Sequence, residues 1–363
     1  MMKKTLIAVI TGMSMMFTGA GTVMAEQPQE VSDEVNENER PEFGGEENGG
    51  TGGERMGKDG FGERGKGGPG GNGGNGAGGF GGMTDKSDDT ELQEMISEVK
   101  DQFTTGAYTD EESGLTVPYD LYLPQDYDES RNYPMVVFIG DATTVGTDLE
   151  YSLTQGWGGI VWATEEEQEK QEAIVLVPVF PETVIDDNNG ASKSDYLLLI
   201  PRMIEAVSQE YAVDTDRIYG TGQSMGAMAT LYTAANYPEL YAAVLIVDGQ
   251  WDTSELSGLE TQNMVYIAAG GDQKASQGQA DVKAMLDNLG VSYAQAEGWD
   301  AQAEAEDLAG LCEELFSEGE SINFITWEAG TVLNGSNGSE HMASFDYAYK
   351  LSAVRDWLFE QSR

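Results

Sequence analysis

One stretch of the sequence decides the fold: Asp216-Arg217-Ile218-Tyr219-Gly220-Thr221-Gly222-Gln223-Ser224-Met225-Gly226-Ala227-Met228-Ala229-Thr230-Leu231. It opens with a β-type run, continues as Gly-x-Ser-x-Gly, and then turns to residues that favour a helix. A strand, a tight turn and a helix in this order form a nucleophile elbow, which exposes a serine hydroxyl at the carboxyl edge of a parallel sheet. The two glycines of the motif leave room for such a strained turn. We therefore expect Ser224 to be a nucleophile and the backbone N–H of Met225 to bind a developing oxyanion.

A serine nucleophile needs a base and an orienting carboxylate, because the pentapeptide alone is a weak signal in a chain with 47 glycines. The only histidine is His341, on the loop that we expect after the last strand and before the C-terminal helix. For the acid we prefer Asp272, which follows the apolar run 264–269 and a Gly-Gly turn. Asp248, after the preceding run, and Asp252 are the competing candidates. The order serine, aspartate, histidine is the one found in α/β hydrolases.

Residues 91–363 read as one large α/β domain, in which short apolar runs alternate with helical patterns. This alternation predicts a mostly parallel central sheet with helices on both faces. The expected strands are 104–108, 115–123, 135–139, 174–179, 217–219, 243–247, 264–268 and 322–327, with the first two paired as a hairpin. The expected helices are 194–211, 224–236, 280–289, 304–317 and 345–361.

Residues 1–90 have a different character. Lys3 and Lys4, an apolar stretch and the small residues before Glu26 are typical of a signal peptide over 1–25, which predicts an exported protein. The segment 44–82 contains 21 glycines in 39 residues, so we expect 26–90 to be a disordered, acidic linker. A passive spacer is the favoured reading of that linker, and a tether that associates with the cell envelope is the alternative.

Charge and cysteine content exclude several functions. The segment 91–363 holds 11 basic and 49 acidic residues, which disfavours nucleic acid and other polyanions as partners. The single cysteine, Cys312, allows no intramolecular disulfide and is expected to be a packed side chain. The run Asp186-Asp187-Asn188-Asn189-Gly190 lacks the glycine position and the final glutamate of a calcium loop, so we predict no metal site.

The run Tyr211-Ala-Val-Asp-Thr-Asp-Arg-Ile-Tyr219, followed by Gly222-Gln-Ser-Met-Gly226, resembles the secreted prolyl-oligopeptidase-like esterases and their polyhydroxybutyrate-depolymerase and feruloyl-esterase relatives. The resemblance covers roughly 114–359 and is specific around the elbow. It implies an α/β-hydrolase fold, hydrolysis of small-molecule or polymer-linked carboxylic esters, and no cofactor. It also implies that Ser224 is the nucleophile, His341 the base and Asp272 the acid.

The sequence departs from this family at the loop after the third strand, where a His-Gly-x-Gly motif is replaced by Gly140-Asp141-Ala142-Thr143. The second oxyanion donor would then be the N–H of Asp141 or Ala142. A carboxylate at this position opposes catalysis unless it turns away from the oxyanion. This loop makes a non-catalytic binding protein with the same fold one alternative. The resemblance leaves a serine peptidase of the prolyl-oligopeptidase type as the other. Three residues that flank strand ends are candidates for the substrate pocket: Gln223, Trp157 and Trp251.

Overall fold

The computed structural model describes residues 86–188 and 190–363. The predicted signal peptide, 1–25, lies outside the described residues, and so does all of the predicted linker before residue 86. The first helix, α1 (Thr90–Val99), was not expected from the sequence. Asp89 caps it, because one carboxylate oxygen accepts the Leu92 N–H at 3.0 Å. Helix α1 thus begins at the last residue that we assigned to the linker.

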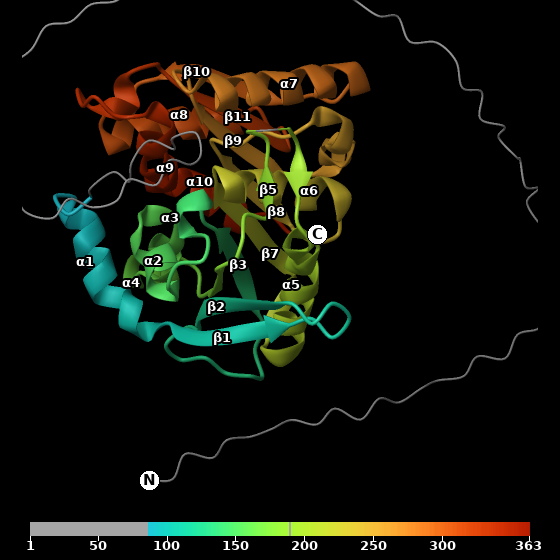
Figure 1. Ribbon diagram of the computed structural model, residues 1–363. Helices are drawn as coiled ribbons and strands as arrows, with labels where there is room; N and C mark the ends of the chain where they lie inside the picture. Colours follow the sequence, from blue (N-terminus) through green and yellow to red (C-terminus); the bar gives the residue numbers. More distant parts are fainter. Residues whose placement is uncertain (1–85, 189) are drawn as a thin grey trace, which may run out of the picture. The chain divides into compact units, whose positions relative to one another are not determined.

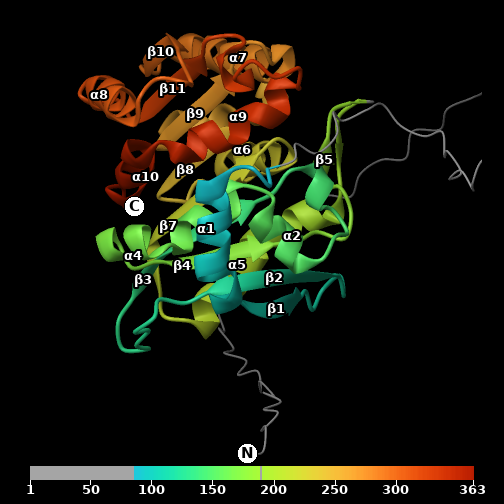
Figure 2. The same cartoon turned by 90° about the vertical axis from the view of Figure 1, so that its left-hand side faces the viewer.

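Within the described residues, nine strands form one sheet (Figures 1 and 2). Only the β1–β2 and β2–β4 pairs are antiparallel, and the other six pairs are parallel, as the alternation of strands and helices predicts. In spatial order the strands are β1 (Thr104–Thr109), β2 (Thr116–Tyr122), β4 (Ile174–Pro178), β3 (Tyr133–Ile139), β7 (Val213–Gln223), β8 (Ala243–Val247), β9 (Met264–Ala269), β11 (Ile322–Trp327) and β10 (Ala294–Trp299).

Helices cover both faces of the sheet, and each face has its own hydrophobic core. Alternate side chains of β3 show the division, since Val137 packs into one core and Phe138 into the other. The first core is covered by α5 (Leu199–Glu210), α6 (Met225–Asn236) and α7 (Gln273–Leu289). The second lies beneath α1, α2 (Leu149–Thr154), α3 (Trp157–Ile160), α8 (Ala305–Phe316), α9 (Glu340–Lys350) and α10 (Ser352–Phe359), which face the viewer's side in Figure 2.

Shorter elements complete the described chain. A buried ion pair between Glu167 and Arg355, 2.8 Å, joins α4 (Glu165–Lys170) to α10. A two-stranded hairpin is formed by β5 (Ile185–Asp186) and β6 (Ser192–Lys193). The 3₁₀ turns are Lys100–Gln102, Ala142–Thr144, Val161–Ala163, Asp195–Leu198, Thr253–Glu255, Ser257–Thr261 and Thr331–Leu333.

Two helices begin earlier than the sequence predicts. The helix expected at 280–289 starts at Gln273, because Asp272 caps it. Gly278 inside this helix lies against Gln250, and an added Cβ would come within 2.1 Å of that side chain. The helix expected at 345–361 is two helices, α9 and α10, that meet at Leu351. His341 therefore lies in the first turn of α9 and not on the preceding loop, which corrects the prediction.

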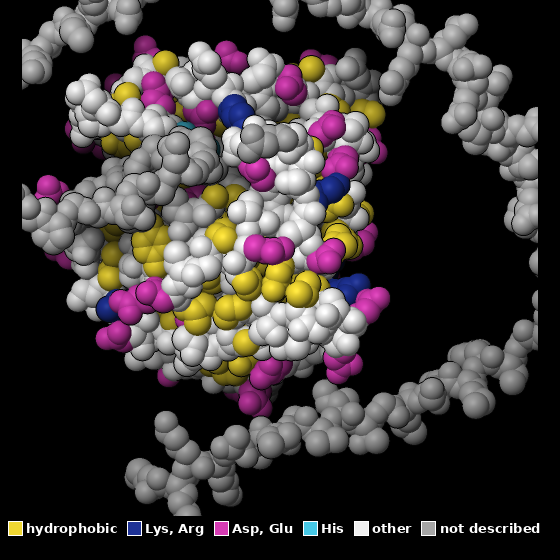
Figure 3. All heavy atoms as spheres, in the orientation of Figure 1, with side chains coloured by type: hydrophobic (Ala, Val, Ile, Leu, Met, Phe, Trp, Pro, Cys, Tyr) yellow, Lys and Arg dark blue, Asp and Glu magenta, His cyan; other side chains and the backbone are white. Residues whose placement is uncertain are grey.

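The surface of the described part is acidic, and Figure 3 shows Asp and Glu side chains spread over one face with few Lys or Arg among them. Cys312 is fully buried, as expected, and burial raises the pKa of its thiol to about 12. Among the described helices, none combines the length and the apolar character needed to cross a membrane.

Candidate active site

The turn between β7 and α6 holds Ser224 in a strained backbone conformation, with φ 52° and ψ −115°. A positive φ is unfavourable for a residue with a side chain, and it persists only where the surroundings impose it. The Ser224 N–H donates to the Val247 carbonyl of the neighbouring strand at 3.0 Å. The two glycines of the motif are required by close backbone contacts. A Cβ on Gly226 would lie 1.9 Å from the Ile139 carbonyl oxygen, and one on Gly222 would lie 2.4 Å from the Gly226 carbonyl carbon.

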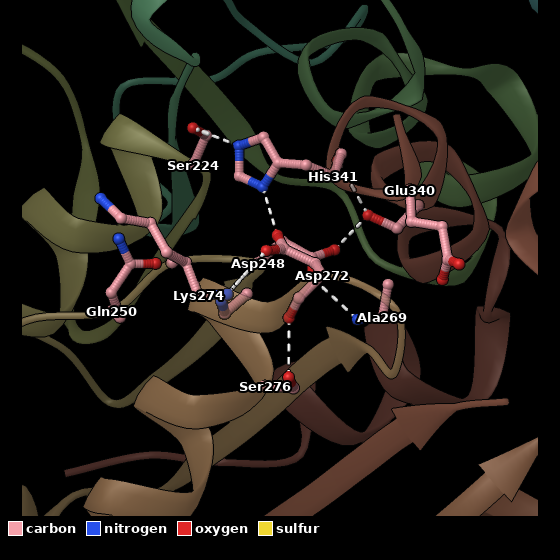
Figure 4. A network of polar contacts seen from close by, with 12 residues as sticks. Ser224, Asp248, Gln250, Ala269, Asp272, Lys274, Ser276, Glu340 and His341 are labelled. Atoms are coloured by element: carbon pink, nitrogen blue, oxygen red, sulfur yellow. Dashed lines mark hydrogen bonds and ion pairs between the residues drawn. The ribbon is translucent and has the colours of Figure 1, made fainter. Parts of the chain in front are cut away.

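Three side chains that are far apart in the sequence meet at this turn (Figure 4). The Nε2 atom of His341 lies 2.8 Å from Ser224 Oγ, and its Nδ1 atom lies 2.5 Å from Asp272 Oδ2. Asp272 is the N-cap of α7, and its other oxygen accepts the Lys274 and Ala275 N–H groups at 3.1 and 3.2 Å. The rings of His341 and Phe345 pack nearly perpendicular to each other, with their centres 5.1 Å apart.

His341 and Asp272 each stabilise the charged form of the other. Burial by itself lowers the pKa of His341, but the hydrogen bond to Asp272 and the charges of Asp248, Asp272 and Asp141 outweigh it, so the pKa lies above its usual value. Burial likewise raises the pKa of Asp272, yet the hydrogen bond and charge of His341 and the two backbone N–H groups bring it below its usual value. Asp272 is therefore ionised at neutral pH, where it favours an imidazolium.

The two competing carboxylates are engaged by other groups. Asp248 is fully buried at the end of β8, where it accepts the Ala269 N–H at 2.8 Å and a hydrogen bond from Ser344 Oγ. Asp252 caps a 3₁₀ turn by accepting the Ser254 N–H at 2.9 Å. Among the described residues, Asp272 is the carboxylate whose hydrogen bond reaches the ring of His341.

Glu340 connects the loops around Gly271 and Gly330, a role that sequence reasoning missed. One of its oxygens accepts the Gly271 N–H at 3.0 Å, next to Asp272, and the other accepts the Gly330 N–H at 3.0 Å. A Cβ on Gly271 would collide with this carboxylate at 1.9 Å. No sequence pattern marks the contact with Gly271, because Glu340 lies 69 residues further along the chain.

The loop after β3 lies beside the turn that carries Ser224. Asp141 caps the 3₁₀ turn Ala142–Thr144, and its Oδ1 accepts from the N–H and the hydroxyl of Thr143 at 2.7 and 2.6 Å. Its Oδ2 accepts from the side-chain amide of Gln223 at 2.9 Å. Both carboxylate oxygens are thus engaged within the loop. Ala142, at the first position of the turn, lines the same cavity as Ser224, whereas Asp141 does not.

The cavity beside Ser224 has a volume of about 320 Å³. Its apolar wall comes from Ala142, Met225, Met228 and Met342, and its polar rim from Asp187, Asn188, Gln250 and Lys274. Hydrogen bonds connect three of the rim residues, since Asp187 accepts from Lys274 Nζ at 2.7 Å and from the Gln250 side-chain amide at 2.8 Å. A larger hollow of about 770 Å³ lies near α4 and contains none of these groups.

None of the three predicted pocket residues lines this cavity, which corrects the prediction. Gln223 is buried and its amide is directed to Asp141. Trp157 packs into the second core, and its indole N–H donates to Asp89 at 3.4 Å. Trp251 packs into the first core and donates to Glu255 at 2.7 Å. Both tryptophans bury their rings and place the N–H on a carboxylate, which is the usual way of satisfying a buried indole.

Metal ligands are not gathered anywhere in the part of the chain that the structure describes, where no group of three or more His, Cys, Asp or Glu side chains is suitably placed. Asp187 and Asn188, from the run compared with a calcium loop, instead contact Lys274 Nζ at 2.7 and 3.1 Å.

A mostly parallel sheet covered by helices on both faces, with a serine on a strained strand-to-helix turn, defines an α/β hydrolase. The Esterase family model matches residues 112–305, which is more than half of the chain, and the chain belongs to that family. The matched segment contains Ser224 and Asp272 and ends before His341.

Known relatives match over shorter stretches. Acetylxylan esterase A of Aspergillus awamori is 37% identical over 139 residues, which is 36% of this chain and 41% of that protein. Acetylxylan esterase A of Aspergillus ficuum is 40% identical over 62 residues, or 17% of this chain and 20% of that protein. The chain therefore spans less than half the length of these curated relatives. Among solved structures, a thermostable esterase is similar, with 26% identity and a TM-score of 0.55 over 73% of this chain and 64% of that one.

Proposed function

We propose that the protein hydrolyses carboxylic esters through an acyl-enzyme, with Ser224 as nucleophile, His341 as general base and Asp272 as the orienting acid. The observation that carries this proposal is the chain of contacts from Ser224 Oγ to His341 Nε2, 2.8 Å, and from His341 Nδ1 to Asp272, 2.5 Å, beside a cavity. A nucleophile in contact with a base that is itself held by a third group is the arrangement that serine hydrolases require.

The reaction proceeds in two halves. Ser224 Oγ attacks the ester carbonyl carbon while His341 Nε2 takes the hydroxyl proton, and the resulting imidazolium is stabilised by Asp272. The imidazolium then gives this proton to the leaving alkoxide as the C–O bond breaks, which leaves an acylated Ser224. Water, deprotonated by His341, attacks the acyl carbon, and the proton returns to Ser224 as the carboxylic acid departs.

The oxyanion of each tetrahedral intermediate is bound by two backbone N–H groups. Met225 is the first residue of α6, where a helix leaves the N–H without an intrahelical partner. We assign the second donor to Ala142 in preference to Asp141, because Ala142 lines the cavity. The carboxylate of Asp141 is directed to Thr143 and Gln223, and Asp141 does not line the cavity, which supports catalysis at this loop over a non-catalytic binding protein.

We further propose that the acyl group is small and that the alcohol is hydroxylated. The matched relatives bear the name acetylxylan esterase, the cavity is modest at about 320 Å³, and its rim offers amide, ammonium and carboxylate groups for hydroxyls. No observation specifically favours a peptidase. Export through the segment 1–25 stays part of the proposal, and detection of the processed chain outside the cell tests it.

The experiment compares three proteins on acetyl, butyryl and feruloyl esters and on aminoacyl amides: the wild type, Ser224→Ala, and Ser317→Ala as a control on α8. We expect the wild type and the control to hydrolyse esters with the acetyl substrate preferred, and Ser224→Ala to lose the activity. Hydrolysis of amides in preference to esters would show that the protein is a peptidase and not an esterase. Undiminished hydrolysis by Ser224→Ala would overturn the proposal.

A further inference from the structure

Asp248 is a second buried carboxyl group close to His341, and the mechanism described above gives it no role (Figure 4). It is fully buried at the end of β8 and has a φ of 45°, a conformation that a non-glycine residue adopts only when its surroundings enforce it. Its Oδ1 accepts the Ala269 N–H at 2.8 Å, which ties it to β9. Its Oδ2 is hydrogen-bonded to the hydroxyl of Ser344, one turn after His341 on α9.

The number of hydrogens available at Ser344 bears on whether this carboxyl group is protonated. Ser344 Oγ contacts two oxygens, Oδ2 of Asp248 and the backbone carbonyl of His341 at 3.0 Å. A hydroxyl has one hydrogen, so it can donate to only one of them. If Asp248 is ionised, one of the two contacts has no hydrogen. If Oδ2 of Asp248 carries a proton, it donates to Ser344 Oγ, Ser344 donates to His341, and every contact is a hydrogen bond.

We propose that Asp248 is held protonated below neutral pH and acts, through Ser344, as a positioning residue that fixes the first turn of α9 and thereby the imidazole of His341. The inference rests on the proposed function for its effect on catalysis, but not for the protonation itself. Above neutral pH the carboxyl group ionises, the Asp248–Ser344–His341 chain loses one hydrogen, and a second negative charge appears beside the imidazole.

The surroundings of Asp248 favour this behaviour. Burial raises its pKa to about 7, and the charge of Asp272 adds to this effect, while His341, Ser344 and the Ala269 N–H oppose it. The titratable groups that face it are Asp272 at the start of α7, His341 on α9 and Tyr266 on β9. Tyr266 donates to the Gly249 carbonyl, and its pKa is well above the usual value, mainly through burial, so it stays neutral. Ionisation of Asp248 thus acts chiefly on His341, whose pKa it raises.

Three variants separate the charge of Asp248 from its hydrogen bonds. Asp248→Asn keeps an acceptor for Ala269 and a donor for Ser344 but can carry no charge. Asp248→Ala removes both the charge and the hydrogen bonds, and Ser344→Ala breaks the link to α9 while leaving the carboxyl group. The C2–H resonance of His341 reports its titration in each protein without assignment, because the chain has one histidine, provided that the protein is purified without a histidine tag.

We expect the His341 midpoint to move to lower pH in Asp248→Asn, because the second charge never forms. The midpoint of kcat/KM should follow the same shift. Asp248→Ala and Ser344→Ala should lower kcat about tenfold relative to Asp248→Asn, within the range that a misplaced catalytic group costs. An infrared carbonyl band of a protonated carboxyl group should be present in the wild type below neutral pH and missing in Asp248→Asn.

The outcomes distinguish this inference from the proposed function. If Asp248→Asn, shown by circular dichroism to be folded, has the same His341 midpoint as the wild type and the infrared band is unchanged, Asp248 is not protonated as proposed, whatever the enzyme hydrolyses. If the midpoint and the band change as expected in a protein that hydrolyses no ester, the protonation of Asp248 stands and the proposed function falls.

Discussion

Asp272 has two tasks, one for each carboxylate oxygen. Oδ1 caps α7 through two backbone N–H groups, and Oδ2 holds Nδ1 of His341. Because the cap already restricts the carboxylate, the hydrogen bond to His341 costs little additional conformational freedom. Structure and proposed catalysis therefore depend on the same side chain, and substitutions can separate them.

Asp272→Asn should separate the two tasks. Asparagine caps helices as well as aspartate does, so stability should change little, but its amide favours the wrong imidazole tautomer and kcat should fall by orders of magnitude. Asp272→Ala should in addition lose about 1 kcal/mol of unfolding free energy. Kinetics and urea unfolding measure the two effects. An Asp272→Asn enzyme with nearly normal kcat would show that another group orients His341.

At this scale the sequence named Ser224, His341 and Asp272, which the structure brings into contact. It could do so because the chain has one histidine and the aspartate follows a recognisable strand and turn. It did not reveal Glu340 or the Ser344 contact of Asp248, since both depend on how α9 packs against the loops after β8 and β9. The pocket prediction failed because a tryptophan near a strand end packs in the core as readily as it lines a cavity.

At the scale of elements, the elbow depends on how closely α6 approaches the end of β3. Gly226 lies where its missing side chain lets the helix contact the Ile139 carbonyl. Such an approach puts the N-terminus of α6, with the Met225 N–H, against the loop that carries Ala142. The proposed oxyanion site is thus a consequence of backbone packing between two elements.

Gly226→Ala tests this packing. The added Cβ would lie 1.9 Å from the Ile139 oxygen, so the helix must shift, and we expect a loss of about 2 kcal/mol or more in unfolding free energy together with lower kcat. Gly310→Ala in α8 is the matched control, because nothing lies within 4 Å of its Cβ. The control should be neutral or stabilising by about 0.5–1 kcal/mol. Equal stability of the two variants would contradict the close approach.

The β5–β6 hairpin and α7 meet at the rim of the cavity through Lys274 and Asp187. Lys274→Met removes this contact one residue after the helix start, and we expect KM to rise severalfold with little change in kcat, because the rim is loosened while the reacting groups stay in place. Lys283→Met is the control on the same helix, where the ammonium pairs with Glu297 away from the cavity. A fall in kcat without a change in KM would assign Lys274 to the chemistry instead.

For the elements, the sequence predicted the fully buried strands, and it predicted the exposed edge strand β1 as the hairpin partner of β2, but it missed the other edge strand. The strands β3, β8 and β9 are continuous apolar runs and were found. The edge strand β10, Ala294–Trp299, is largely exposed and polar, and it was missed. The helix α4 was missed for a similar reason, since its six residues are Glu, Gln and Lys.

At the scale of the whole molecule, the excess of carboxylates acts on the single histidine. The segment 91–363 has 38 more acidic than basic residues, and this field favours the charged imidazolium in addition to the hydrogen bond with Asp272 and the charge of Asp248. The sequence predicted this charge fully, because it depends on composition and not on packing.

The pH profile should reflect both the local and the global charge. A general base must be neutral, so kcat/KM should rise with pH through the pKa of His341, which lies above 6.5, and then level off. The midpoint should be higher at low salt than at high salt, because salt screens the surface carboxylates. Because the pKa of His341 is higher in the folded protein than in the unfolded chain, protonation of His341 stabilises the fold. This stabilisation is complete below the pKa of histidine in the unfolded chain and is lost as pH rises through the pKa in the folded protein. A midpoint below 6.5, or one that rises with salt, would contradict the account.

The assignment of Ser224 as the nucleophile is tested most directly by the site at which a fluorophosphonate probe labels the protein. We expect a single adduct in the intact-mass spectrum, mapped by peptide sequencing to Ser224, and a labelling rate that rises with pH along the His341 titration. The variant Ser224→Ala should carry no adduct. An adduct on another serine, or no adduct on a folded protein whose His341 titrates normally, would show that Ser224 is not the nucleophile.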